Sequence, residues 1–153
     1  MRYYGFSNMY LSSIQQGLQA AHVITEMFSK YATSDEEFDV GLNIMMEWAD
    51  DHKTIILLNG GNSGDLEELV AFFDSKDNKF PHDCFFEDQV SLNEALTSVG
   101  IILPSRIYEE GQAILRAEKL KYPRNYEGLI LLPGYTDFES ELIARLSTYR
   151  LAS

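Results

Sequence analysis

Apolar residues recur at helical spacing near the start of the chain, in the segment SSIQQGLQAAHVITEMF (residues 12–28). Steps of three and four residues stack side chains on one side of an α-helix. The pattern therefore predicts a helix over residues 12–31, capped by Ser12 or Ser13. The face expected to be buried consists of Ile14, Leu18, Ala21, Ile24 and Phe28.

A second stripe at the same spacing is polar and nearly uncharged, and it consists of Gln15, Gln19, His22 and Glu26. The solvated face of a helix usually carries charged residues instead. The stripe therefore either packs against another part of the chain or lines a site. The sequence leaves both interpretations open.

Further along the chain, apolar runs bounded by turn residues predict strands, and helical periodicity returns between them. Strands are expected near residues 2–11, 53–59, 83–87, 99–104 and 127–134, and further helices near residues 34–50, 63–73, 109–122 and 137–151. The run at 53–59 is almost continuously apolar, as in a strand covered on both faces. Helices that alternate with buried strands predict a three-layer α/β domain, and a length of 153 residues favours a single domain.

Charge restricts the partners that such a domain could have. The formal net charge of −12 repels nucleic acids and anionic membranes at long range. Five of the twelve basic residues fall in residues 106–124, so this segment is the candidate for any contact with a phosphate backbone; the alternative is an ordinary solvated helix face. No apolar stretch reaches the length of a membrane span, and the single cysteine, Cys84, excludes an internal disulfide. We therefore expect a cytoplasmic protein.

Several short motifs resemble known functional motifs but lack residues that those motifs require. NGGNSGD at residues 59–65 lacks the lysine of a phosphate-binding loop, which favours a tight turn. HKT at residues 52–54 is only half of the signature of the two-histidine phosphoesterases. The acidic clusters lack the ordered spacing of a cation-binding loop, and Cys84 has no basic neighbour in sequence to activate a thiolate. The sequence predicts neither a metal site nor a cofactor.

The order of several segments carries more information than any one of them. LQAAHV places Gln19 and His22 three residues apart on the first helix, Trp48 precedes KTIILL, GDLEELVAFF follows, and FFED ends in Asp88. This order, completed by LTSVGIILP, resembles the type II peptidyl-tRNA hydrolase family, in particular a divergent branch of phage or bacterial type. The resemblance covers residues 1–106 and leaves residues 107–153 as a C-terminal extension with a closing helix.

The resemblance implies a three-layer α/β/α fold with a mixed sheet of about four strands. It also implies hydrolysis of the ester in peptidyl-tRNA, with Gln19, His22 and Asp88 as catalytic residues. In that site His22 would donate a hydrogen bond and Asp88 would orient a water molecule. Gln15 and Ser13 stand where the family has basic residues, and with Arg106 they are the expected substrate-binding residues.

Three functions follow from these observations. The first is a divergent hydrolase acting on peptidyl-tRNA or a related ester. The second is a catalytically inactive binding module, whose acidic surface would suit a basic host protein or whose altered site would take a nucleotide-like ligand. The third is an accessory protein whose residues 107–153 form a subunit interface, since homodimers are common.

Overall fold

The computed structural model describes residues 1–33, 40–87 and 94–152. The chain divides into two compact units. Unit 1 comprises Met1–Ile102 and Arg150–Ser153, and unit 2 comprises Leu103–Tyr149. The division predicted from the sequence, a single domain with a core at residues 1–106, stays a prediction. In the part of the chain that the structure describes, no helix is long and apolar enough to cross a membrane.

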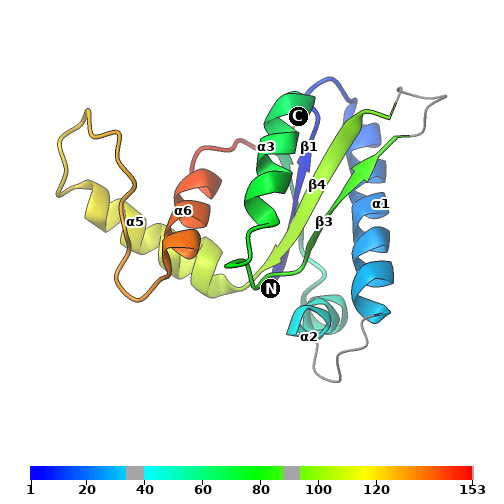
Figure 1. Cartoon of the computed structure of the whole chain (residues 1–153), viewed down its shortest axis with the longest axis horizontal. Coiled ribbons are helices and arrows are strands. Elements are labelled where there is room, and N and C mark those ends of the chain that lie inside the picture. Colours follow the sequence, from blue (N-terminus) through cyan, green and yellow to red (C-terminus); the bar gives the residue numbers. More distant parts are fainter. Residues whose placement is uncertain (34–39, 88–93, 153) are drawn as a thin grey trace. The chain divides into compact units, whose positions relative to one another are not determined.

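A mixed four-stranded sheet forms the centre of unit 1 (Figure 1). Its strands are β1 (Arg2–Ser7), β2 (Ile55–Asn59), β3 (His82–Phe86) and β4 (Leu96–Leu103), in the order β2-β1-β4-β3. β1 and β2 are parallel, with Tyr3 opposite Ile55, whereas β3 and β4 are antiparallel, with Cys84 opposite Val99. The predicted α/β class and mixed sheet of about four strands are confirmed.

Helices pack on both faces of this sheet because alternate residues of a strand point to opposite sides. Tyr3 and Ile102 belong to a core cluster with residues of α1 (Ser13–Ala32), α2 (Val40–Glu47) and the π-helical turn η1 (Trp48–His52). On the other face, Phe6 meets Phe73 of α3 (Ser63–Phe73) edge to face, with ring centroids 5.9 Å apart. The predicted helix at residues 34–50 is described only from residue 40 onward.

The buried face of α1 differs from the predicted one. Ile14 and Leu18 are 78% and 57% exposed, respectively. The buried residues are instead Gln16, Gln19, Ala20, Val23 and Met27. Ala20 is small enough for the helix to approach the sheet, where its carbonyl accepts a hydrogen bond from the Tyr3 hydroxyl at 3.4 Å. The predicted N-cap is confirmed at Ser12, which forms a capping box with Gln15.

The turn predicted at residues 59–65 is present and leads into α3. Asn62 caps the helix, and its side chain accepts hydrogen bonds from the backbone N–H groups of Gly64 and Asp65. The Asp65 carboxylate accepts in return from the Asn62 N–H at 2.8 Å. A carboxylate therefore already occupies the positive end of α3.

β2 lies at an edge of the sheet, and most of its side chains are not buried. The prediction that residues 53–59 are covered on both faces is therefore wrong. Ile55 is 48% exposed, and of the five residues of β2 only Leu58 is buried. The last described residues of the chain return to this edge, where Leu151 forms an isolated antiparallel bridge with Leu58. The Ala152 N–H donates to the Leu57 carbonyl at 2.9 Å.

Unit 2 contains the π-helical segment η2 (Arg106–Gly111), α5 (Gln112–Lys119) and α6 (Asp137–Leu146). The predicted helices at residues 109–122 and 137–151 are confirmed in shorter form. The predicted strand at residues 127–134 is wrong, because these residues form no strand pairing. Ile130 and Leu132 are nevertheless buried, and the Leu132 N–H donates to the Ser140 hydroxyl of α6 at 3.0 Å.

Candidate functional site

Gln19 is the most constrained of the predicted catalytic residues. It lies on the buried face of α1 and is 6% exposed. Its Oε1 accepts a hydrogen bond from the Thr97 hydroxyl at 3.1 Å, and its Nε2 donates to the Glu87 carboxylate. Both functions of the amide are thus used, and the side chain connects α1 to the end of β3 and the start of β4.

A groove with a volume of about 320 Å³ is lined by Thr97, the hydrogen-bond partner of this amide. Gln15, Thr97, Tyr10 and Ser63 are among its lining residues, which Asn8, Leu11 and Ala95 complete. The Asn8 amide donates to the Ser63 hydroxyl at 3.1 Å, and this hydroxyl donates to the Leu96 carbonyl at 3.3 Å. The groove therefore has polar side chains fixed by hydrogen bonds in a largely apolar wall, and none of its seven lining residues carries a charge.

The remaining residues predicted on α1 lie at the surface. Gln15 is exposed, and its Oε1 accepts from the Ser12 N–H at 2.9 Å in the capping box. Ser13 is exposed at the first position of α1. His22 is exposed as well and stacks on Phe85 of β3, with ring centroids 4.4 Å apart and an angle of 11° between the planes.

The structure brings only part of the predicted site together. Gln19 bonds to Thr97, which lines the groove beside Gln15. His22 stacks on Phe85 near the end of β3, and Gln19 bonds to Glu87, two residues further along the chain. Asp88 falls outside the described residues.

Arg106 lies in unit 2, where its guanidinium is engaged within the same unit. It donates to the Glu139 carboxylate at 2.5 Å and to the Gly134 carbonyl at 2.6 Å. It also lies over the Tyr135 ring, 4.2 Å from the centroid. The hydrogen bond to Glu139 holds the pKa of Arg106 above its usual value.

Sequence reasoning missed Thr97, Glu87, Asn8 and Ser63. The signal for Thr97 was present, because a polar Thr-Ser pair interrupts the apolar run LTSVGIIL, which is buried throughout. A buried hydroxyl needs a hydrogen-bond partner. The buried amide of Gln19 supplies one for Thr97.

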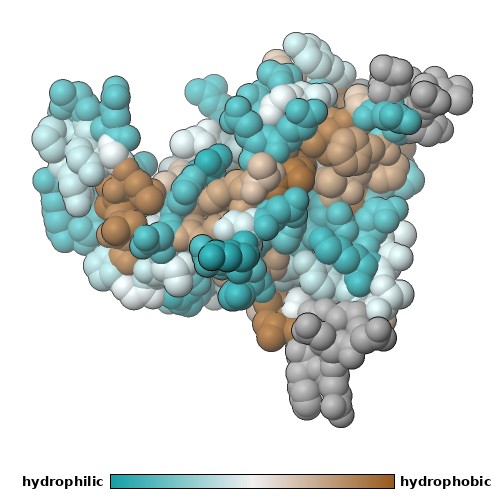
Figure 2. Space-filling view, in the orientation of Figure 1, coloured by the Kyte–Doolittle hydropathy of each residue, from teal (hydrophilic) through white to brown (hydrophobic). Residues whose placement is uncertain are grey.

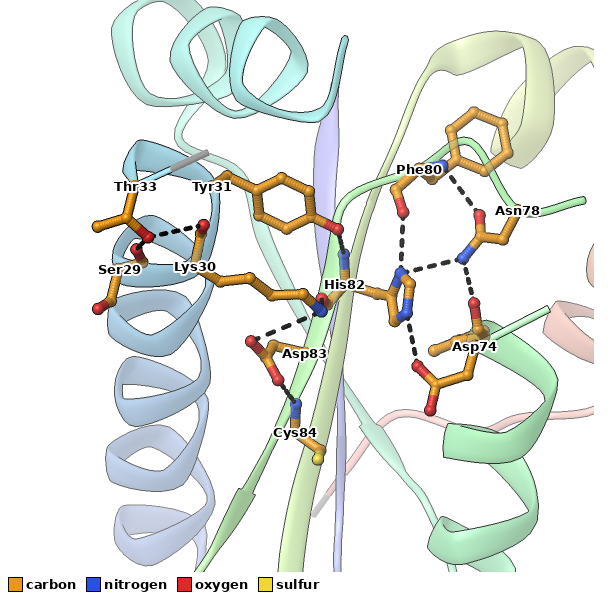
Figure 3. A network of polar contacts seen from close by, with 11 residues as sticks. Ser29, Lys30, Tyr31, Thr33, Asp74, Asn78, Phe80, His82, Asp83 and Cys84 are labelled. Atoms are coloured by element: carbon orange, nitrogen blue, oxygen red, sulfur yellow. Dashed lines mark hydrogen bonds and ion pairs between the residues drawn. The ribbon is translucent and has the colours of Figure 1, made fainter. Parts of the chain in front are cut away.

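A second polar cluster joins α1, α3 and β3 (Figure 3). The His82 ring contacts the Asp74 carboxylate through Nε2 at 3.0 Å and the Asn78 amide through Nδ1 at 3.1 Å. Lys30 donates to the His82 carbonyl at 3.1 Å and lies 3.9 Å from the Asp83 carboxylate. The cluster borders a cavity of about 240 Å³.

Cys84 lines the same cavity, but its chemistry is not that of a nucleophile. Burial raises the pKa of the Cys84 thiol to about 11, with further contributions from the Asp83 and Asp74 carboxylates. At neutral pH the residue is therefore a thiol, whereas thiolates are the reactive species. The second cluster connects α1, α3 and β3 through hydrogen bonds and is assigned a structural role.

No metal site is formed by histidine, cysteine, aspartate or glutamate side chains among the residues that the structure describes. No protein-family model matches the chain, and no curated protein matches it in sequence.

Proposed function

We propose that unit 1 has a type II peptidyl-tRNA hydrolase-like fold and that the protein cleaves the ester of peptidyl-tRNA or a related substrate in the cytoplasm. The observation that carries this proposal is the hydrogen bonding of Gln19, whose amide is fixed by Thr97 and Glu87, because Thr97 also lines a groove. Fixed polar groups beside a groove are what a hydrolytic site needs to position a substrate.

Each residue has a defined task in the proposed site. The Thr97 hydroxyl and the Glu87 carboxylate hold the Gln19 amide in one orientation. His22 donates a hydrogen bond to the substrate, and Asp88, the next residue after Glu87, orients the attacking water. Gln15 and Ser13, at the start of α1, contact the substrate without contributing charge.

A second candidate function is binding without catalysis. The groove has no cation among its lining residues, although RNA affinity depends mainly on cations that contact phosphates. Apolar side chains are exposed near it, since Met9 is 50% exposed, Tyr10 80% and Ile14 78%. Exposed apolar clusters of this kind mark contacts with other proteins. The partner would be a basic host protein or a second copy of the chain.

The test is the release of free tRNA from a peptidyl-tRNA substrate at low salt. The wild type is compared with Asp88→Asn and Thr97→Val, and with Asp77→Asn, an exposed carboxylate in the loop after α3, as a control. We expect turnover by the wild type and by the control. Loss of an acid–base or water-orienting group typically lowers the rate by about 10²–10⁴-fold, so Asp88→Asn should fall by that factor.

Thr97→Val keeps the size of the side chain and removes the hydroxyl that holds Gln19. A smaller loss than for Asp88→Asn, with unchanged circular dichroism, would support a positioning role for this hydroxyl. No turnover by the wild type at high enzyme concentration would end the hydrolase proposal. The binding function would then be tested by pull-down with a basic protein partner and by the oligomeric state in solution.

A further inference from the structure

A second pocket lies in unit 2, in the segment that the sequence marked as locally basic. It has a volume of about 600 Å³, within the range of small-molecule sites. Its lining residues come from α5, the following segment and α6, and they are Leu115, Lys119, Tyr122, Pro123, Arg124, Tyr126, Gly128, Leu129, Ile130 and Ala144. Figure 2 shows hydrophobic surface over the segment after α5, with hydrophilic surface beside it.

The charged residues of this lining are both cations. Lys119 and Arg124 line the pocket, and no carboxylate does. Within the described residues neither cation forms an ion pair, whereas the neighbouring Lys121 is paired with Glu118 at 2.6 Å. In a chain with a net charge of −12, two cations without carboxylate partners in one pocket favour an anionic ligand there.

The rest of the lining is aromatic and aliphatic. The rings of Tyr122 and Tyr126 pack against each other, with centroids 4.5 Å apart at an angle of 38°, and remain 38% and 44% exposed. The Tyr126 ring lies against the backbone of Gly128, where any Cβ would collide with it. Leu115 and Ile130 are buried beneath and supply an apolar floor.

We propose that this pocket binds a nucleotide. An aromatic base would stack on the tyrosine pair, and Lys119 and Arg124 would hold the phosphate. A purely apolar ligand would leave both cations without a role, and a lone phosphate would leave the tyrosines and the apolar floor without one. The proposal rests on unit 2 alone and does not depend on hydrolysis by unit 1.

The test is calorimetric titration of the full chain with adenosine 5′-monophosphate, and separately with adenosine and with inorganic phosphate. We expect the mononucleotide to bind more tightly than either fragment. The double variant Lys119→Gln/Arg124→Gln should weaken its binding by at least about tenfold, because charge-assisted hydrogen bonds to phosphate are lost. Lys121→Gln is the matched control, since Lys121 belongs to the same segment but is not among the lining residues.

Gly128→Ala tests the aromatic half, because a Cβ at this position displaces the Tyr126 ring without changing charge. It should weaken binding of both adenosine and the mononucleotide. A short oligoadenylate distinguishes the source of the ligand: equal affinities indicate a free nucleotide, and much tighter binding of the oligonucleotide indicates the end of a strand, with the site upheld in both cases. The proposal would be overturned if neither the mononucleotide nor the oligonucleotide bound. It would also be overturned if Lys121→Gln lost as much affinity as the double variant.

Discussion

Cys84 shows how burial and charge together set the reactivity of one residue. Its thiol is half-buried, the Asp83 and Asp74 carboxylates oppose its ionisation, and its pKa is about 11. An exposed cysteine has a pKa near 8.5. At pH 8 the thiolate fraction, and with it the rate of alkylation by iodoacetamide, should therefore be about two orders of magnitude lower than for the same cysteine in the urea-unfolded chain. The rate should rise steeply up to pH 11.

Asp83→Asn isolates the contribution of the carboxylate, because the amide oxygen can still accept the Cys84 N–H that now bonds to Asp83 at 2.8 Å. We expect a lower thiol pKa and faster alkylation at pH 8, with Asp77→Asn as the control. The Cys84 thiol has a higher pKa in the folded chain than in the unfolded chain. Its contribution to the free energy of unfolding is therefore complete below about pH 8.5 and is lost as the pH rises through 11. An alkylation rate equal to that of the unfolded chain would contradict this account.

At the scale of elements, the first turn of α6 is fixed by three residues. Thr136 caps the helix, and Glu139 closes the capping box by accepting the Thr136 N–H at 2.9 Å. Arg106 donates to the same carboxylate at 2.5 Å. Burial acts to raise the pKa of Glu139, but the hydrogen bonds from Arg106 and Thr136 outweigh it and hold this pKa below its usual value.

Glu139→Gln should therefore lower the stability of the protein at pH 7, because Arg106 loses its carboxylate partner. The loss should be only about 1 kcal/mol, since Arg106 is partly exposed and solvent screens the ion pair. A carboxyl group whose pKa is lowered by folding stabilises above its unfolded pKa of about 4.3 and loses that contribution as the pH falls further. Urea unfolding at pH 7 and pH 3.5 should show the difference between wild type and variant shrinking at the lower pH. Glu141→Gln, which removes an i,i+4 pair with Arg145, should change the stability less at pH 7.

The same scale shows what local patterns can and cannot predict. Helix and strand positions follow from spacing, and α1, α3, β3 and α6 lie where periodicity places them. The buried face of α1 does not follow, because the burial of Gln19 depends on Thr97, which is distant in sequence. The run at residues 127–134 is apolar enough for a strand, but its Leu132 N–H bonds to a helix side chain instead. Partners that are remote in sequence decide both cases.

The candidate site was predictable to a similar extent. The resemblance directed attention to Gln19, and the structure supplies the reason why its amide is fixed. It could not indicate that the Glu87 carboxylate would accept a hydrogen bond from this amide. The nucleotide pocket of unit 2 was visible in the sequence only as a local excess of basic residues, because the contribution of Ala144 from α6 is a tertiary feature.

At the scale of the whole molecule, charge is divided unequally along the chain. Residues 1–102 contain five basic residues (lysine and arginine) and seventeen acidic residues (aspartate and glutamate). Residues 103–149 contain six basic and seven acidic residues. Unit 1 therefore carries nearly all of the net negative charge. A basic protein partner is expected to associate with unit 1 faster at low salt, and an anionic ligand meets less repulsion in unit 2.

The chain also returns to unit 1 after unit 2, which makes the stability of unit 1 depend on residues from both ends of the sequence. The Ala152 N–H donates to the Leu57 carbonyl and the Asn59 N–H donates to the Arg150 carbonyl, both at 2.9 Å, so part of the β2 edge is covered. Ala152→Pro removes the first donor. We expect a loss of about 1 kcal/mol in urea unfolding and a greater tendency to aggregate, because an uncovered edge strand can pair with another chain. Leu151→Ala is the control. It keeps the backbone hydrogen bonds and shortens a side chain that is 71% exposed. If Ala152→Pro were as stable as Leu151→Ala and the wild type, the returning segment would not hold the edge of the sheet.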